Sequence, residues 1–98
     1  NTSNLALVKT VTNDNGGIAV ATDWTLNAAG PTPLSGAGGV TITAVDAGTY
    51  VLTETGGPAG YTAGAWSCTA GTLTGNSLAL ALGESATCTI INDDMGAT

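Results

Sequence analysis

The stretch Leu5-Ala6-Leu7-Val8-Lys9-Thr10-Val11 alternates between two sets of side chains, as a β-strand with one buried face does. The face with the bulkier side chains consists of Leu5, Leu7, Lys9 and Val11. The pattern therefore places the amine of Lys9 in the core. Lys9 is the only basic residue of the chain. An isolated buried ammonium costs several kcal/mol unless it is paired, neutralised or consumed.

Two further polar residues fall on predicted core faces. In Tyr50-Val51-Leu52-Thr53-Glu54, the carboxyl group of Glu54 is in phase with the tyrosine and the leucine. In Thr87-Cys88-Thr89-Ile90-Ile91-Asn92, the carboxamide of Asn92 is in phase with the cysteine and the first isoleucine. An amine, a carboxyl group and a carboxamide that all face one core are the components of an amide bond that a protein forms within itself.

The rest of the chain predicts an all-β fold. Short apolar or Thr-rich runs alternate with clusters of Gly, Pro, Asn and Asp, and no stretch has the period of a helix. Seven strands are expected, at residues 5–12, 22–29, 39–45, 48–55, 63–70, 77–82 and 86–92. This spacing indicates a seven-stranded, Ig-like β-sandwich. Residues 1–94 would form this single domain, and residues 95–98 a linker or tail.

The charge and hydropathy of the chain exclude several classes of partner. The 98 residues carry a formal net charge of −6, from seven acids against one lysine. Nucleic acids and anionic membrane surfaces are therefore excluded, because both require a basic patch. Membrane insertion is also not expected, since no apolar run approaches the roughly 20 residues of a membrane span. A chain this small has a thin core, so covalent cross-links matter more to it than to a larger protein.

The two cysteines, Cys68 and Cys88, allow one intrachain disulfide. Each is in phase with an apolar neighbour, Trp66 and Ile90 respectively, and an even cysteine pair in a Lys-poor β domain is typical of an exported protein. The alternative is a pair of buried free thiols. No metal is expected here, because no histidine or further cysteine completes a zinc set.

Four parts of the sequence together resemble the Cna-B or SpaA type of domain, found in bacterial surface proteins and pili. They are Lys9 in the first strand, Ala47–Glu54, the segment Pro58-Ala59-Gly60-Tyr61, and Ile90-Ile91-Asn92. The resemblance extends over residues 5 to 94 and implies a prealbumin-like sandwich. The motif Tyr-x-Leu-x-Glu, followed by Pro-x-Gly-Tyr, is its most specific part.

In that family the matching lysine and asparagine become joined by an intramolecular isopeptide bond, and the matching glutamate catalyses the reaction. The resemblance thus implies a Lys9–Asn92 cross-link with Glu54 as catalyst, no cofactor, and a single self-reaction rather than enzymatic turnover. It implies a structural stalk or spacer domain of a secreted or cell-surface adhesin, pilus or fibre. Its partners would be neighbouring domains of the same polypeptide or copies in a fibre. The cysteine pair is not part of the family pattern, and no cell-wall sorting motif is present.

A buried ion pair is the simplest alternative for these three residues. Lys9 and Glu54 would form a salt bridge, and Asn92 would be their hydrogen-bond partner. Such a pair is an unexpected use of the only lysine, since well-packed apolar residues often replace buried ion pairs without loss of stability.

A binding module, adhesive towards a host or matrix ligand, is the other alternative. Oxygen atoms of Asp14, Asp93 and Asp94 would be the candidate calcium ligands, although their spacing matches no EF-hand loop. Solvated turn acids explain them more simply. A sugar-stacking platform would use the aromatic residues, which are Trp24, Trp66, Tyr50 and Tyr61. Trp24 and Tyr50 are in phase with Leu26 and Leu52, so these two are expected in the core instead.

Overall fold

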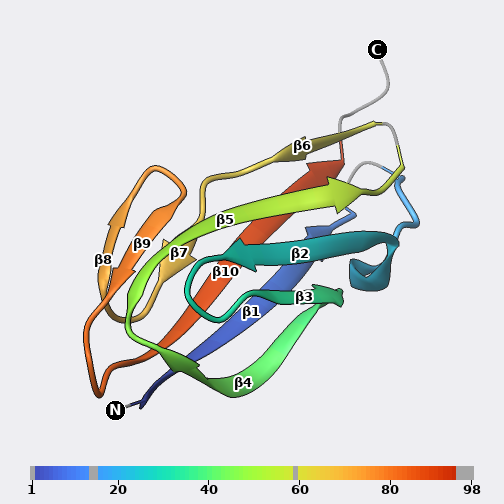
Figure 1. Cartoon of the computed structure of the whole chain (residues 1–98). Coiled ribbons are helices and arrows are strands. Elements are labelled where there is room, and N and C mark those ends of the chain that lie inside the picture. The colour runs from blue at the N-terminus through green and yellow to red at the C-terminus, as the bar shows by residue number, and fades with distance from the viewer. Residues whose placement is uncertain (1, 14–15, 59, 95–98) are drawn as a thin grey trace.

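The computed structural model describes residues 2–13, 16–58 and 60–94. Over these ranges it forms a two-layered β-sandwich with one short 3-10 turn, η1 (Ala21–Asp23). The strands are β1 (Thr2–Thr12), β2 (Trp24–Ala29), β3 (Leu34–Ala37), β4 (Gly39–Asp46), β5 (Gly48–Gly56), β6 (Tyr61–Ala63), β7 (Ser67–Cys68), β8 (Thr72–Thr74), β9 (Ser77–Leu80) and β10 (Ser85–Asp94). Sheet A has the order β4-β1-β10-β6, with β7 also paired to β10, and sheet B has the order β3-β2-β5-β9-β8 (Figure 1). The predicted all-β sandwich is confirmed.

Six of the seven predicted strands are present, as β1, β2, β4, β5, β9 and β10. The prediction of one continuous strand at residues 63–70 is wrong. The chain pairs with β10 as β6, leaves its edge, and pairs with it again as β7. Ala63 lies opposite Asn92 and Ser67 opposite Thr89, so β10 advances by three residues while its partner advances by four. The extra residue breaks the strand into β6 and β7, as a bulge does.

Two strands, β3 and β8, were not predicted. Both are very short and lie at the edges of sheet B. β8 pairs with β9 through a two-residue turn, Gly75-Asn76, in which Gly75 has a φ of +62°. A two-residue Gly-containing turn is a hairpin signal. The seven-strand prediction is therefore corrected to ten strands over the described residues.

The first and last strands lie side by side in the middle of sheet A. β1 pairs with β10 in parallel, from Asn4 opposite Ser85 to Thr12 opposite Asp93. The start of β1 and the end of β10 therefore lie at opposite ends of the elongated sandwich (Figure 1). We call these ends the N-terminal pole and the C-terminal pole.

The core lies between the two sheets and is built of aliphatic side chains around one tyrosine. Tyr50 is fully buried, and its hydroxyl donates to the carbonyl oxygen of Asp46 at 2.6 Å and accepts from the backbone N–H of Thr32. Trp24 is also buried, whereas Trp66 is half-buried against the core. The predicted core positions of Tyr50 and Trp24 are confirmed.

Candidate functional site

Three polar side chains from three strands meet between the sheets, near the C-terminal pole. The side chain of Lys9, on β1, has 0% exposure, and Asn92, on β10, is also buried. Lys9 lies opposite Ile90 and Val11 opposite Asn92, so the two polar side chains are diagonal neighbours on the inner face of sheet A. Glu54 reaches them from β5 in sheet B, where its side chain keeps 15% exposure.

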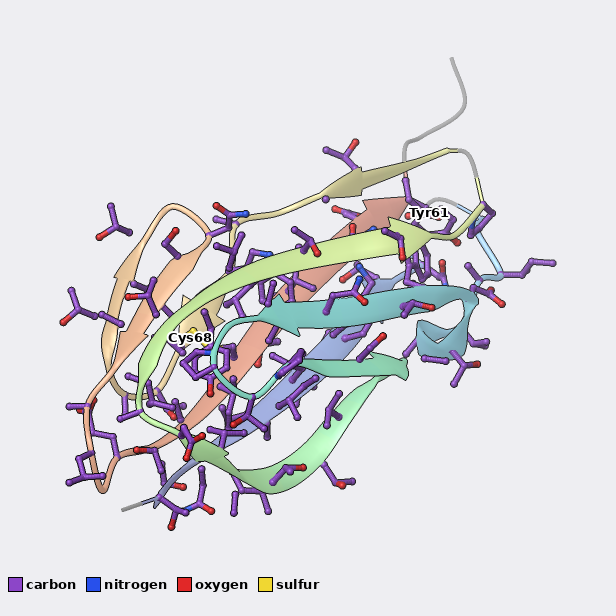
Figure 2. The ribbon with its side chains drawn as sticks, in the orientation of Figure 1. Tyr61 and Cys68 are labelled. Carbon is purple, nitrogen blue, oxygen red and sulfur yellow. A yellow bond between two sulfur atoms is a disulfide. The ribbon has the colours of Figure 1, made fainter. Side chains whose placement is uncertain are left out.

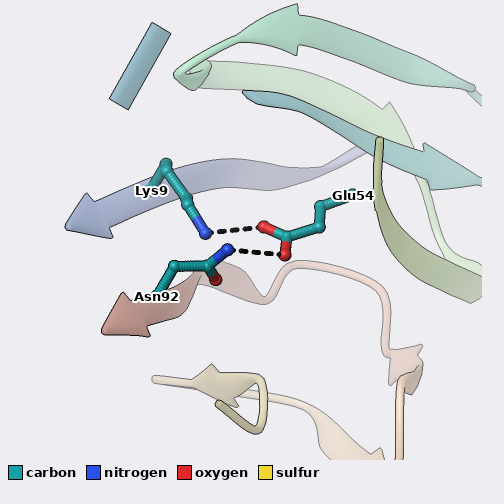
Figure 3. A network of polar contacts seen from close by, with 3 residues as sticks. All are labelled: Lys9, Glu54 and Asn92. Carbon is teal, nitrogen blue, oxygen red and sulfur yellow. Dashed lines mark hydrogen bonds and ion pairs between the residues drawn. The ribbon is translucent and has the colours of Figure 1, made fainter. Parts of the chain in front are cut away.

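The carboxylate of Glu54 contacts both partners at once. Its Oε2 lies 2.6 Å from Nζ of Lys9, and its Oε1 accepts a hydrogen bond from Nδ2 of Asn92 at 3.0 Å (Figure 3). Each of the two carboxylate oxygens therefore contacts a different group. The amine and the carboxamide are therefore held beside each other on one edge of a single carboxylate, as Figure 3 shows.

Oδ1 of Asn92 is buried and has no hydrogen-bond partner within the part of the chain that the structure describes. A buried acceptor without a partner costs about 1–3 kcal/mol. The ionised Glu54 carboxylate offers only acceptors, so it can accept an N–H of Asn92 but leaves the oxygen unpaired. A protonated Glu54 facing the amide oxygen would supply the missing donor.

Aromatic residues close the site towards the C-terminal pole. Nζ of Lys9 lies 4.5 Å from the centroid of the buried Trp24 ring, within cation–π range. The ring of Tyr61 packs edge-on against Trp24, with centroids 5.2 Å apart and planes at 80°. Gly57, with a φ of +85°, covers the indole, and a Cβ there would lie 2.0 Å from its Nε1. A side chain at Gly57 would therefore displace Trp24 from the lysine.

Tyr61, labelled in Figure 2, is held in place by hydrogen bonds to Asn13 and Ala19. The Tyr61 hydroxyl donates a short hydrogen bond to Oδ1 of Asn13 and accepts one from the backbone N–H of Ala19. The backbone N–H of Gly17 donates to Oδ2 of Asp94 at 2.6 Å, which ties the loop that contains Ala19 to the end of β10. These contacts fix the ring of Tyr61 against Trp24, which in turn covers the amine of Lys9.

Cys68 and Cys88 form the expected disulfide, with Cys88 fully buried and Cys68 half-buried. The two residues lie directly opposite each other on β7 and β10. The bond therefore fastens the two-residue β7, whose ladder is too short to hold by itself, to the last strand of the domain (Figure 2).

Reduction of this disulfide is expected to lower the free energy of unfolding by about 3 kcal/mol, because the bond closes a loop with a separation of 20 residues. Denaturant unfolding with and without reductant measures the change. A double variant, Cys68→Ala with Cys88→Ala, serves as the control, since reductant should leave its unfolding curve unchanged. Identical curves for oxidised and reduced wild-type protein would contradict the expectation.

The candidate calcium ligands are not brought together as a set. Asp14 lies outside the described residues. Asp93 is exposed whereas Asp94 is buried and bonded to Gly17, because consecutive residues of β10 point to opposite faces. The described residues contain no group of three or more His, Cys, Asp or Glu side chains that could hold a metal ion.

The sequence did not indicate the residues that enclose the site. Trp24 was expected in the core, but not over the amine of Lys9, which belongs to the other sheet. The roles of Asn13 and Tyr61 at the C-terminal pole were also missed. The segment Pro58-Ala59-Gly60-Tyr61 was the available signal, since it placed an aromatic residue shortly after Glu54.

None of the described residues belongs to a helix that is long and apolar enough to cross a membrane. Comparison with protein families gives one match, to the SpaA model described as a prealbumin-like fold domain, over residues 1–90. The matched range includes Lys9 and Glu54 and ends two residues before Asn92. No curated protein and no solved structure matches the chain.

Proposed function

The chain belongs to the SpaA family of prealbumin-like fold domains, and from this premise we propose that it is a structural stalk or spacer domain closed by a Lys9–Asn92 isopeptide bond. Glu54 would catalyse the formation of that bond. The domain would belong to a secreted or cell-surface protein, such as an adhesin or a fibre. Its partners would be neighbouring domains of the same polypeptide or further copies in a fibre. Domains of this family are structural units of pilus and surface proteins, which fits this role.

One observation carries the proposal: a single carboxylate between the sheets contacts both the buried amine and the buried carboxamide, which come from the first and the last strand. The groups are held in contact by the fold, and proximity of this kind contributes about 7–11 kcal/mol to lowering a barrier. That is sufficient for a reaction that occurs only once in the life of each molecule.

The reaction begins with a proton transfer from the ammonium of Lys9 to Oε2 of Glu54. The two atoms lie 2.6 Å apart, within reach of a direct proton transfer, and the step replaces two charges by two neutral groups. The neutral amine is the nucleophile that the reaction requires. Protonated Glu54 can then donate to Oδ1 of Asn92 once the carboxamide has turned over, which polarises the carbonyl and satisfies the unpaired oxygen.

Attack of Nζ on Cγ of Asn92 forms the new amide bond, and the bond from Cγ to Nδ2 breaks. Nζ gives up one proton to the departing nitrogen, with Glu54 as the carrier, so ammonia leaves. The proton that Lys9 first released stays on Glu54 or leaves with the ammonia as ammonium. Glu54 can then hydrogen-bond to the new amide. The reaction requires no oxidant, metal or cofactor.

The buried ion pair explains the same contacts less completely. It leaves Oδ1 of Asn92 without a donor. It also keeps the only cation of the chain in the interior, where apolar side chains would serve as well or better.

Intact mass after full reduction is the direct test, on wild type and on Lys9→Met, which keeps a long side chain but removes the amine. Wild type is expected to be lighter than its sequence mass by one ammonia, and fragmentation should join the peptides containing Lys9 and Asn92. Lys9→Met should give no linked peptides and should lack the loss of ammonia that belongs to the cross-link. Asn15-Gly16 can lose ammonia through a succinimide, but that loss would occur in both proteins. If wild type yields no linked peptides, the proposal is contradicted, and Lys9 and Glu54 form only an ion pair.

A further inference from the structure

The charges of the domain lie at its two poles and not on its sides. Asp46 and Glu84 lie beside the first residues of β1, at the N-terminal pole. Asp23, Asp93 and Asp94 lie at the C-terminal pole, around the loop that holds Tyr61. Among the described residues, the remaining charges are those of Lys9 and Glu54 inside the sandwich.

The outer face of sheet A is free of charge over most of its length. Its members are aliphatic residues and threonines, namely Ala6, Val8, Thr10, Ile42, Ala44, Thr87, Thr89 and Ile91. Three large aliphatic side chains stand exposed there: Val8 by 39%, Ile42 by 55% and Ile91 by 48%. The outer face of sheet B exposes one, Val51, by 40%, among threonines.

These aliphatic residues form a stripe across β4, β1 and β10, with threonines between them. Val8 and Ile42 line the same open groove of about 540 Å³, together with Ala6 and Thr87. Thr89 lies opposite Val8, and Ile91 lies opposite Thr10, one step further along β1. The solvent-facing side of a sheet normally carries polar side chains. An unprotected apolar stripe of this kind marks an interaction surface.

We propose that the outer face of sheet A binds the same face of a second copy of this chain, so that two domains associate side by side. The charge pattern favours this partner. Each copy carries a net charge of −6 and its lysine is buried, so contact between poles brings acid against acid. A basic partner would be attracted to the poles and would gain nothing on an uncharged face. A second copy contributes an equally neutral, aliphatic surface, as a two-fold symmetric contact requires.

The area of the outer face of sheet A indicates how strongly two copies should associate. Three strands of eight to eleven residues cover roughly 35 Å by 14 Å, or about 500 Å² on each copy. A total near 1,000 Å² is at the low end for specific contacts and corresponds to weak, reversible association. Association of this strength becomes important when many copies are held close together, as in a fibre or on a surface.

Sedimentation velocity over a wide concentration range tests the proposal, on wild type, Val8→Lys, Ile42→Lys and Val51→Lys. Wild type is expected to associate reversibly, and more strongly as salt screens the acidic poles. Val8→Lys and Ile42→Lys should each lower the association constant at least about tenfold, because the contact would then bury two ammonium groups without partners. Val51→Lys is the matched control, since it makes the same change at the same exposure on the other sheet, and association should persist.

A wild-type protein that stays monomeric at every concentration overturns the proposal, as does a Val51→Lys variant that is impaired as much as Val8→Lys. Far-UV circular dichroism confirms that each variant is folded. This proposal is independent of the isopeptide bond, because the residues that carry it point away from Lys9 and Asn92. Lys9→Met should therefore associate as wild type does, and failure of either proposal can be recognised separately.

Discussion

Glu54→Gln is expected to leave the chain at its full sequence mass, without the isopeptide bond, and to remove most of its folding stability. Glutamine cannot take the proton from Lys9, so the amine stays charged and unreactive. An ammonium buried without its counter-ion costs about 3–5 kcal/mol. Loss of the cross-link costs about 4–5 kcal/mol more, because that bond closes almost the entire chain into one loop. Small domains are stable by only about 5–15 kcal/mol. Intact mass and denaturant unfolding measure the two effects.

Glu84→Gln is the matched control, since Glu84 is the only other glutamate of the chain. Its Oε1 accepts a hydrogen bond from the backbone N–H of Ala81 at 2.7 Å, in the turn before β10. A glutamine oxygen can accept the same bond, so the cost should be about 1 kcal/mol or less, and the cross-link should form. Cross-linking of Glu54→Gln to the wild-type extent would show that Glu54 is not the catalyst.

The alternation of side chains predicted which residues enter the core. Lys9, Asn92 and Tyr50 are buried as their strand phases indicated, because the two-residue period of a strand fixes the face of each residue once a neighbour is assigned. Glu54 keeps a little exposure but points between the sheets. The two-residue period alone therefore predicted that Lys9, Glu54 and Asn92, from three separate strands, all point between the sheets.

The surroundings of the site could not be predicted in the same way, because periodicity carries no information on which strands face each other. Trp24 comes from sheet B and reaches the amine of Lys9 only because the two sheets are stacked at that point. Asn13 and Tyr61 meet through a side-chain hydrogen bond across 48 positions. The break between β6 and β7 depends on the count of residues along β10, which becomes visible only once the strands are paired.

The arrangement of β1 and β10 connects the cross-link to a mechanical role. Because the two strands are parallel neighbours, a pull on the two poles slides one strand along the other and loads their hydrogen bonds together. In a sandwich without a covalent link, failure of this one pair would free the whole chain. A bond between Lys9 and Asn92 joins the two loaded strands near their carboxyl ends, so force passes from one to the other without crossing the rest of the sandwich.

Pulling on the chain ends in a single-molecule experiment is therefore expected to produce no unfolding extension in wild type between residues 9 and 92. Lys9→Met lacks the bond and should release up to roughly 280 Å of chain under reducing conditions, at about 3.3–3.6 Å per residue. With the disulfide intact, the same variant should release roughly 70 Å less, because the segment between Cys68 and Cys88 stays closed. This difference serves as an internal calibration of length. A wild-type protein that extends as far as Lys9→Met carries no covalent link between its first and last strands, and the domain would then resist force through hydrogen bonds and the buried ion pair alone.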